Sequence, residues 1–330
     1  MPLFLELVRE VSERDPKLAS DALAGLRAYE TAPRRERPAT KPEIGRVRGA
    51  TLRDQGGDDA PVVLVPSLIN PPRILDLDEE VSLTAAIARA GRRVLLIDWG
   101  PADARSELDV AGHVEQLLLP LLRSMDEPAT LVGYCLGGTM ALAAANLIEV
   151  AGVVTLAAPW NFGAYPENSR QALHNMWRHS EAAAHSLGAL PMEVLQAAFW
   201  SLDPERTVRK FAEFGCLDPA SAEARRFIEL EEWANEGEPL PYPAAKELVE
   251  EMFDKNVPGT GNWSVGGRPV SDKLQAPVLH LTAERDSIAP PQTVASGVVI
   301  AIPSGHVGMI VGSARRRLHE ELNAFLTPCR

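Results

Sequence analysis

A cysteine in a glycine-rich turn is the residue of this 330-residue sequence that points most directly to chemistry. Residues 133–138 read GYCLGG, after a short apolar run and before an alanine-rich segment. A strand, a tight turn and a helix in this order are typical of a nucleophile elbow. The helix start favours a thiolate, so Cys135 is the candidate nucleophile. The alternative is a buried structural cysteine beside a glycine-rich helix start.

Two residues further along the chain are candidate partners of this cysteine. Residues 277–282 (PVLHLT) predict a strand, and Asp286 follows it closely. His306 follows the last predicted strand, residues 298–301, in a loop with glycines on both sides. A nucleophile, a base and an acid that orients the base make a catalytic triad, here Cys135, His306 and Asp286. Glu284 is an alternative acid, and a helix-capping aspartate and a solvated loop histidine are the non-catalytic alternatives.

A third part of the site is expected after the predicted strand at residues 62–65, where the sequence continues PSLINP. The loop after this strand supplies one backbone N–H of an oxyanion hole, and the residue after the nucleophile supplies the other. Ile69 is the first choice for the former, with Leu68 second, and Leu136 is the latter. The alternative is an ordinary proline-rich strand exit.

The elements that must position these residues alternate along the chain between apolar strands and helices. This alternation, with the chain order nucleophile, acid, histidine, predicts an α/β-hydrolase fold, a mostly parallel sheet flanked by helices with an inserted helical cap. Residues 59–164 and 271–330 are predicted to form its two core parts, and residues 165–270 the cap. Residues 1–58 are predicted to be a helical segment and linker.

The N-terminal helix is predicted to be amphipathic, because Leu3, Leu7, Val8 and Val11 recur at helical spacing. Such a stripe more often docks on another surface than anchors in a membrane. Few parts of the predicted sheet are available to cover it. We therefore expect it to dock on a second subunit or a partner.

Composition narrows the class of protein further. The net charge is −12 and the only basic run is at residues 315–317, so nucleic acid is not an expected partner. Three cysteines, Cys135, Cys216 and Cys329, make no disulfide framework and indicate a reducing compartment. The first residues lack the pattern of a signal peptide, and no apolar run reaches membrane-spanning length. A cytoplasmic protein is expected.

Several motifs resemble those of the polyhydroxyalkanoate synthases. Residues 65–70 (VPSLIN) and 74–77 (ILDL) are similar to their V-P-x-x-I-N…I-L-D-L segment, and GYCLGG matches their G-Y-C-x-G-G box. Residues 304–308 (SGHVG) resemble their histidine box, and residues 266–268 their G-G-R turn. Residues 199–210 (FWSLDPERTVRK) are similar to a cap segment of the class III catalytic subunits. The resemblance runs from about residue 60 to the end, with the boxes in the same order.

This resemblance implies a Cys–His–Asp triad of Cys135, His306 and Asp286. It also implies 3-hydroxyacyl-CoA as substrate, no metal and no cofactor beyond the CoA thioester. The implied partners are a second helical synthase subunit or a second copy of the chain, together with the surface of a polyester granule, on which the N-terminal stripe could dock. One position departs from the pattern, because Ser287 stands where the family has a histidine after the acid.

Three functions therefore stay open. The first is an acyltransferase that polymerises 3-hydroxyacyl-CoA through a cysteine thioester. The second is a cysteine-dependent hydrolase, either a thioesterase or a depolymerase of the same polyester, and the third is a non-catalytic granule-associated homologue. The acyl length preferred and the residues that bind CoA cannot be read from the sequence.

Overall fold

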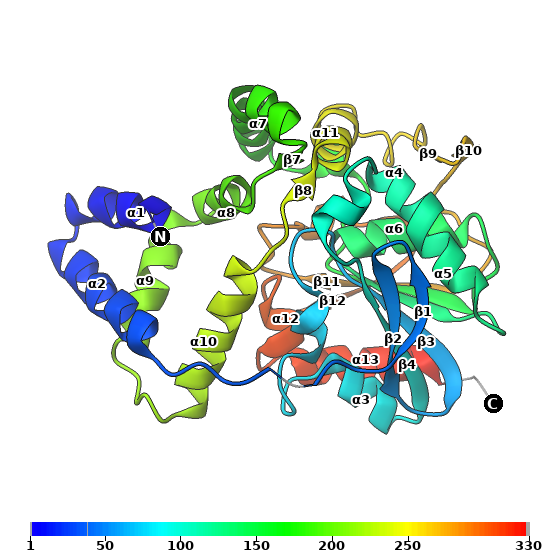
Figure 1. Cartoon of the computed structure of the whole chain (residues 1–330), viewed down its shortest axis with the longest axis horizontal. Helices are drawn as coiled ribbons and strands as arrows, with labels where there is room; N and C mark the ends of the chain where they lie inside the picture. Colours follow the sequence, from blue (N-terminus) through cyan, green and yellow to red (C-terminus); the bar gives the residue numbers. More distant parts are fainter. Residues whose placement is uncertain (1, 38, 328–330) are drawn as a thin grey trace. The chain divides into compact units, whose positions relative to one another are not determined.

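The chain folds into two compact units. The computed structural model describes residues 2–37 and 39–327. Unit 1 combines Met1–Thr40 with Met192–Gly237, and unit 2 combines Lys41–Pro191 with Glu238–Arg330 (Figure 1). The predicted site residues all belong to unit 2. Cys329 lies outside the described residues.

The core of unit 2 is an eight-stranded sheet within the described part of the chain. The central strands of the sheet are mostly apolar and buried because both faces of the sheet are covered. The strand Ala50–Gly56 runs antiparallel to both of its neighbours, and the remaining pairs of strands in this sheet are parallel. In spatial order the strands are β1 (Glu43–Val47), β2 (Ala50–Gly56), β4 (Arg92–Asp98), β3 (Asp59–Val65), β5 (Thr130–Tyr134), β6 (Gly152–Leu156), β11 (Val278–Ala283) and β12 (Val298–Ile302).

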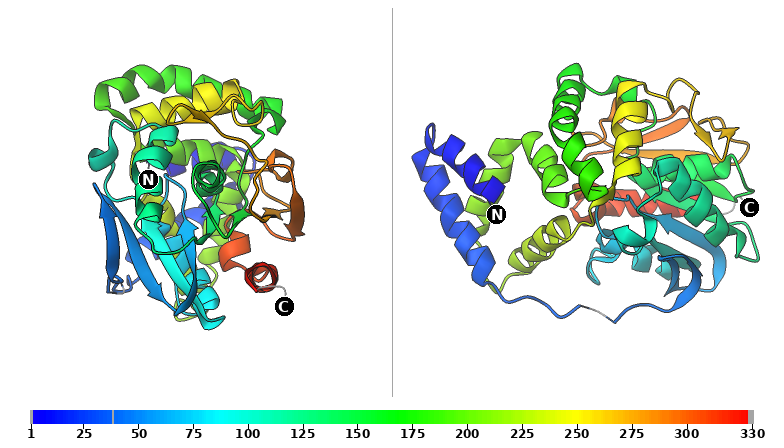
Figure 2. Two further views of the ribbon diagram at one scale, coloured as in Figure 1. Left: turned by 90° about the vertical axis from the view of Figure 1, so that its right-hand side faces the viewer. Right: turned by 45° about the horizontal axis from the view of Figure 1, so that its top comes forward.

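The helices of unit 2 cover the two faces of this sheet. From β3 the chain crosses toward one edge of the sheet and from β5 toward the other, so right-handed crossovers put α3 and α6 on opposite faces. Helix α13 packs with α3, and η3 packs with α6 (Figure 2). The helices concerned are α3 (Leu83–Arg89), α4 (Val110–His113), η3 (Val114–Leu118), α5 (Leu119–Arg123), α6 (Leu136–Ala145), α12 (Gly308–Val311) and α13 (Arg315–Leu326).

A further segment of unit 2 is inserted between β6 and β11. It is largely helical, and Trp177 of α7 stacks on Tyr242 of α11 with ring centroids 6.0 Å apart. The segment begins with η4, which packs against η5. Its elements are η4 (Phe162–Ala164), α7 (Glu167–Leu187), β7 (Ala189–Leu190), β8 (Leu240–Pro241), α11 (Tyr242–Lys246), η5 (Glu247–Asp254), β9 (Ser264–Val265) and β10 (Arg268–Pro269).

Unit 1 is helical and has a core of its own. Phe4 and Val8 of α1, Tyr29 of α2 and Phe211 of α9 belong to one buried cluster, in which Phe4 and Phe211 are 4.5 Å apart between ring centroids. The helices are α1 (Pro2–Ser12), α2 (Pro16–Thr31), α8 (Met192–Ser201), α9 (Pro204–Phe214) and α10 (Ala222–Asn235). The N-terminal helices and the middle of the inserted segment therefore share one core.

Two expectations from the sequence need correction. Residues 43–56, assigned to a helical segment and linker, form β1 and β2 at one edge of the sheet; β1 is largely exposed, so it lacks the apolar run that marks a buried strand. The stripe on α1 is also not left uncovered, because Val8 is 5% exposed and Leu7 and Val11 pack against the same cluster. The side chain of Leu3 lies outside the described residues. Within the described residues, no helix combines the length and the hydropathy needed to cross a bilayer.

Candidate active site

Cys135 stands between β5 and α6 in a strained backbone conformation. Its φ and ψ are 55° and −131°, which residues with a side chain rarely adopt. Its backbone N–H donates to the carbonyl oxygen of Leu156 at 2.9 Å, and its own carbonyl oxygen accepts from Gly138 N–H at 2.9 Å. The neighbouring strand and the first turn of the helix thus hold the strain. Such strain is typical of functional residues at a nucleophile elbow.

Two glycines of the turn are required by close packing. A Cβ on Gly133 would lie 2.4 Å from the Cα of Gly138, so the strand could not meet the helix. A Cβ on Gly137 would lie 2.1 Å from the carbonyl oxygen of Val65 and 2.6 Å from that of Pro66. The start of α6 is therefore packed directly against the exit of β3, where the sequence predicts the oxyanion loop.

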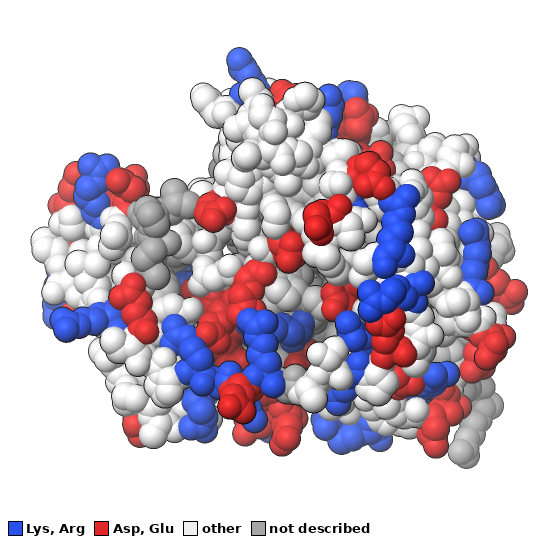
Figure 3. Space-filling model, viewed as in Figure 1, with Lys and Arg blue, Asp and Glu red and all other residues white. Residues whose placement is uncertain are grey.

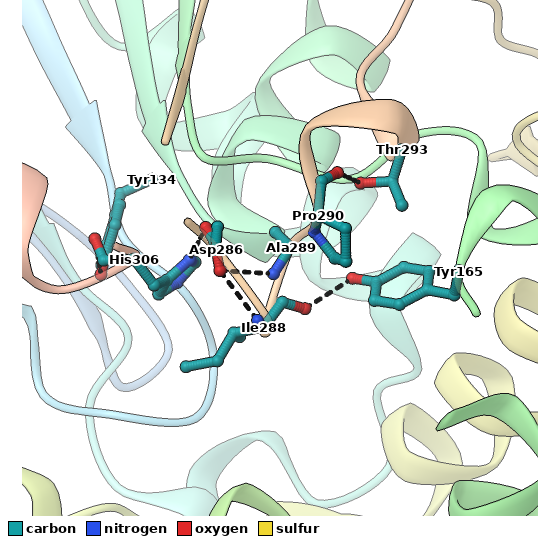
Figure 4. Close-up of polar contacts among 8 residues, drawn as sticks. All are labelled: Tyr134, Tyr165, Asp286, Ile288, Ala289, Pro290, Thr293 and His306. Carbon is teal, nitrogen blue, oxygen red and sulfur yellow. Dashed lines mark hydrogen bonds and ion pairs between the residues drawn. The ribbon is translucent and has the colours of Figure 1, made fainter. Parts of the chain in front are cut away.

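Asp286 and His306 are brought together by two neighbouring parallel strands. Ala283, at the end of β11, pairs with Ile302, at the end of β12, so the loops that follow lie side by side. The Nδ1 of His306 and the Oδ2 of Asp286 are 2.6 Å apart, and both side chains are buried (Figure 4). A carboxylate at this distance fixes the orientation of the imidazole and leaves its other nitrogen, Nε2, for proton transfer.

The other oxygen of Asp286 is held by the backbone of its own loop. Oδ1 accepts from the N–H of Ile288 at 2.8 Å and from that of Ala289 at 2.9 Å (Figure 4). The alternative role, capping the helix near Pro290 and Pro291, is not seen, because η6 (Pro291–Thr293) has no side-chain hydrogen bond at its N-cap. Both oxygens are engaged, so the carboxylate has a single orientation.

The surroundings of His306 favour its protonated form. Burial by itself lowers the pKa of the imidazole, but the charges of Cys135 and Asp286 and hydrogen bonds with both residues outweigh it. The pKa of His306 is therefore raised above its ordinary value. An imidazolium of this kind stabilises a nearby thiolate. Cys135 thus contributes to the raised pKa of His306 although the two residues are more than 170 positions apart in the chain.

Tyr134, the residue before Cys135, lies against the histidine. Its ring centroid is 5.0 Å from that of His306, and its hydroxyl donates to the backbone carbonyl oxygen of His306 at 3.4 Å (Figure 4). Burial raises the pKa of Tyr134 well above its ordinary value, and the charges of Cys135 and Asp286 raise it further. The phenol is therefore uncharged, and its ring packs against His306.

The loop after β3 reaches the same region. Leu68 and Ile69 are buried there, and the N–H of Ile69 is 3.4 Å from the hydroxyl oxygen of Ser67, a long and weak contact. Leu136 is the first residue of α6, so its N–H has no acceptor within the helix. The placement is compatible with Ile69 or Leu68 and Leu136 as oxyanion donors, which stays a prediction.

The two candidate acids lie in different surroundings. Glu284 is exposed, whereas Asp286 is buried against His306. Cys216 is exposed and lies in unit 1. Sequence reasoning missed Tyr134 as a neighbour of His306, although its position next to Cys135 was a usable signal. No group of three potential metal ligands occurs among the residues that the structure describes.

The sheet order and the strand–turn–helix at Cys135 define an α/β-hydrolase fold, as predicted. A solved structure, Epoxide Hydrolase A from Mycobacterium thermoresistibile, superposes with a TM-score of 0.54 at 18% identity, over 87% of this chain and 98% of that chain. This likeness shows the fold alone. No protein-family model matches the chain.

The sequence resemblance is confirmed by curated relatives named poly(3-hydroxyalkanoate) polymerase subunit PhaC. The chain is 28% identical to that of Synechocystis sp. over 81% of its length and 77% of the relative's. It is 26% identical to that of Allochromatium vinosum over 83% of each. The match to that of Haloarcula marismortui is 27% identical and covers 81% of this chain, but this chain spans only 60% of that protein.

Proposed function

We propose that this protein is an acyltransferase that polymerises 3-hydroxyacyl-CoA through a thioester on Cys135. The observation that carries the proposal is the buried Asp286–His306 pair, 2.6 Å apart, whose histidine interacts with the elbow cysteine. The similarity to polymerase subunits supports the substrate class. On this reading the enzyme needs no metal and no resident cofactor.

In the first half of the reaction, the Cys135 thiolate attacks the thioester carbonyl carbon. The carbonyl oxygen becomes an oxyanion, for which the N–H groups of Leu136 and Ile69 are the proposed donors. The C–S bond to CoA then breaks, and the CoA thiolate takes the proton held by His306. The acyl group remains activated, because one thioester has replaced another.

In the second half, the hydroxyl of another 3-hydroxyacyl unit attacks the acyl-cysteine. His306 takes the hydroxyl proton as the new ester C–O bond forms, and the Cys135 thiolate leaves. Asp286 holds the imidazole in the required tautomer and stabilises its protonated form. If water replaces the hydroxyl, the same steps release a free acid.

The proposed place of work is the cytoplasm, at the surface of a polyester granule. The proposed partner is a second helical subunit or a second copy of the chain. Blue and red side chains are interspersed over the face shown in Figure 3. Because the net charge of the chain is −12, a binding site for the anionic CoA moiety has to be a local basic one.

A hydrolase is the second candidate, favoured by one observation. Ser287 follows the acid in place of the family histidine and is exposed. A shorter side chain at this position reaches an incoming hydroxyacyl chain less well. Hydrolysis of the acyl-enzyme by water is the competing outcome, while a non-catalytic homologue would release no CoA at all.

The deciding experiment measures CoA release, polymer and free acid from one 3-hydroxyacyl-CoA, with and without a candidate helical partner. Polymer in proportion to CoA supports the acyltransferase, and free acid in proportion supports the hydrolase. Cys135→Ala should abolish CoA release without unfolding the protein, whereas Cys216→Ala is the matched control. Substantial turnover by Cys135→Ala would exclude the covalent mechanism.

A further inference from the structure

A buried tyrosine reaches the loop that carries the catalytic acid from another part of unit 2. Tyr165 is 8% exposed, and its hydroxyl donates to the carbonyl oxygen of Ile288 at 2.8 Å (Figure 4). The two residues are 123 positions apart in the sequence. The phenol and the Asp286 loop therefore meet only in the folded chain.

The peptide groups around Ile288 connect this phenol to the acid. The carbonyl of Ile288 accepts from Tyr165, and the N–H of the same residue donates to Asp286 Oδ1 at 2.8 Å. The opposite oxygen of Asp286 contacts His306. The bond from Tyr165 to the Ile288 carbonyl thus restrains the Ile288 N–H that donates to Asp286. The chain of contacts runs from Tyr165 to His306 through backbone and carboxylate.

A second set of bonds ties the same two loops together. The backbone N–H groups of Trp160 and Asn161 donate to the carbonyl oxygen of Thr293 at 2.7 and 2.8 Å. The hydroxyl of Thr293 donates to the carbonyl oxygen of Pro290 at 2.7 Å (Figure 4). These bonds hold the far end of the acid loop. At the near end of the acid loop, the hydroxyl of Tyr165 connects Ile288 to the loop after β6.

The ring of Tyr165 is fixed by the inserted segment. Tyr165 follows η4 and lies just before α7, and its ring centroid is 6.0 Å from that of Phe162 and 4.8 Å from that of Phe253 in η5. Burial raises the pKa of the phenol well above its ordinary value, with the charges of Cys135 and Asp286 adding to the effect. The hydroxyl is therefore a permanent donor in a rigid setting.

We propose that Tyr165 is a positioning residue for the catalytic acid, holding the Ile288 peptide so that Asp286 is aligned with His306. This inference rests on the proposed function, because it assigns Asp286 and His306 to the triad. The carbonyl of Ile288 and the N–H of Ala289 belong to one peptide group, and that N–H donates to Asp286 Oδ1 at 2.9 Å. Without the phenol hydroxyl, this peptide is restrained only from the Asp286 side, and Asp286 loses part of the fixed geometry that supports the imidazolium. The imidazolium of His306, whose charge stabilises a nearby thiolate, should then be less favoured.

The test measures Cys135 itself and needs no substrate. In a chain carrying Cys216→Ala and Cys329→Ala, the rate of alkylation by iodoacetamide is followed by intact mass from pH 5 to 9. Tyr165→Phe keeps the ring but removes the donor. We expect its alkylation rate at pH 6.5 to fall roughly three- to tenfold and to recover at high pH, an upward displacement of about 0.5 to 1 pH unit.

Two further variants separate positioning from packing. Tyr242→Phe is the matched control, because Tyr242 also stacks on an aromatic ring and its hydroxyl donates to Glu181, outside the site. The pH profile of alkylation in this variant should equal that of the parent. Replacing Tyr165 by 4-aminophenylalanine restores a donor and should restore the parent profile. A uniform loss of alkylation at all pH values in both Tyr165 variants would indicate packing alone and overturn the inference.

Asp286→Asn distinguishes failure of this inference from failure of the proposed function. If Asp286→Asn displaces the pH profile and Tyr165→Phe does not, the triad stands and the role of Tyr165 is wrong. If neither Asp286→Asn nor His306→Gln changes the profile, the triad itself is wrong. Displacement by both Asp286→Asn and Tyr165→Phe, with rescue by the amino variant, supports the inference.

Discussion

The indole N–H of Trp99 donates to the carbonyl oxygen of Pro66 at 3.1 Å, beside the first turn of α6. Trp99 is buried at the end of β4, and its ring lies edge-to-face on His113 with centroids 6.1 Å apart. The Pro66 carbonyl is one of the two groups that leave no room for a Cβ on Gly137. A tryptophan from the neighbouring strand thus fixes the loop proposed to stabilise the oxyanion.

Trp99→Phe tests this relationship. The variant keeps most of the ring but leaves the Pro66 carbonyl without its indole donor, so the loop after β3 should lose its fixed position. Removing an oxyanion donor outright costs about a hundredfold or more in kcat, and we expect a loss of roughly tenfold for this indirect change. CoA release should fall while iodoacetamide alkylation of Cys135 stays unchanged. If CoA release and alkylation fell equally, Trp99 would only support packing, and the relationship with the oxyanion loop would be wrong.

Asp286→Asn and His306→Gln test the base and its orienter. His306→Gln should lose nearly all CoA release, because His306 is the proposed base and acid of both half-reactions. Asp286→Asn should cost roughly two to four orders of magnitude in kcat, as in triads generally. Glu284→Gln is the control and should change kcat less than twofold, since Glu284 is exposed. An essential Glu284 with a dispensable Asp286 would reverse the assignment.

Ser287→His tests the partition between polymer and free acid. The longer side chain adds a donor directly after Asp286 on an exposed position, where it can reach an incoming hydroxyl. We expect the ratio of polymer formed to acid released to rise, with little change in total CoA release. Product partition at fixed enzyme concentration measures it. A ratio that stays constant or falls means that Ser287 does not limit transfer.

Glu247, the first residue of η5, is a partly buried acid that should make stability depend on pH. Its carboxylate accepts from the N–H of Ala111 at 2.9 Å and from the indole N–H of Trp263 at 2.8 Å. Burial raises the pKa of Glu247 from 4.5 to about 7. The hydrogen bond from Ala111 lowers this pKa, and the charge of Asp109 raises it further. Between these two pH values the folded chain binds more protons than the unfolded chain, so the free energy of unfolding falls as pH rises.

Glu247→Gln should remove this penalty. Above pH 7 the penalty is complete and amounts to at most about 3 to 4 kcal/mol, given about 1.4 kcal/mol for each unit of pKa. The amide keeps an acceptor for one of the two donors but carries no charge. The variant should therefore raise Tm at pH 8 relative to the parent, and raise it less at pH 5. Thermal unfolding at both pH values measures this, and a larger gain at pH 5 would contradict it.

Deletion of residues 1–40 tests the shared core of unit 1. Removing α1 and α2 uncovers Phe211 and Val208 of α9, so residues 192–237 should become sensitive to protease. Unit 2 has its own core and should stay folded. Limited proteolysis followed by mass analysis identifies the cleavage sites. Protection of residues 192–237 equal to that in the full chain would show that the N-terminal helices are dispensable for this core.

The sequence by itself determined the parts of the site that depend on local chemistry. The turn at Cys135 can be read from its glycines, because a Cβ at Gly133 or Gly137 would collide with the backbone. Apolar runs marked the inner strands β3, β5, β6 and β11, since strands covered on both faces admit few polar residues. Asp286 follows the inner strand β11, and His306 follows the edge strand β12, whose apolar sequence marked it although much of it is exposed.

Only the tertiary structure decided which side chains face one another. Glu284 and Asp286 lie two residues apart in one turn, and the path of that turn buries Asp286 against His306 and leaves Glu284 in solvent. The hydroxyl of Tyr165 donates to Ile288, 123 residues away in the chain. The indole of Trp99 donates to Pro66, 33 residues away. No local pattern encodes such pairs.

The domain organisation was also decided by tertiary contacts. The exposed edge strand β1 has no continuous apolar run, so residues 43–56 gave no strand signal. The apolar stripe of α1 shows that a partner surface exists but does not say which one. In the structure that surface includes α9, because the N-terminal helices and residues 192–237 bury their aromatic side chains in one core. Amphipathic periodicity reports a buried face, whereas only the folded chain specifies what buries it.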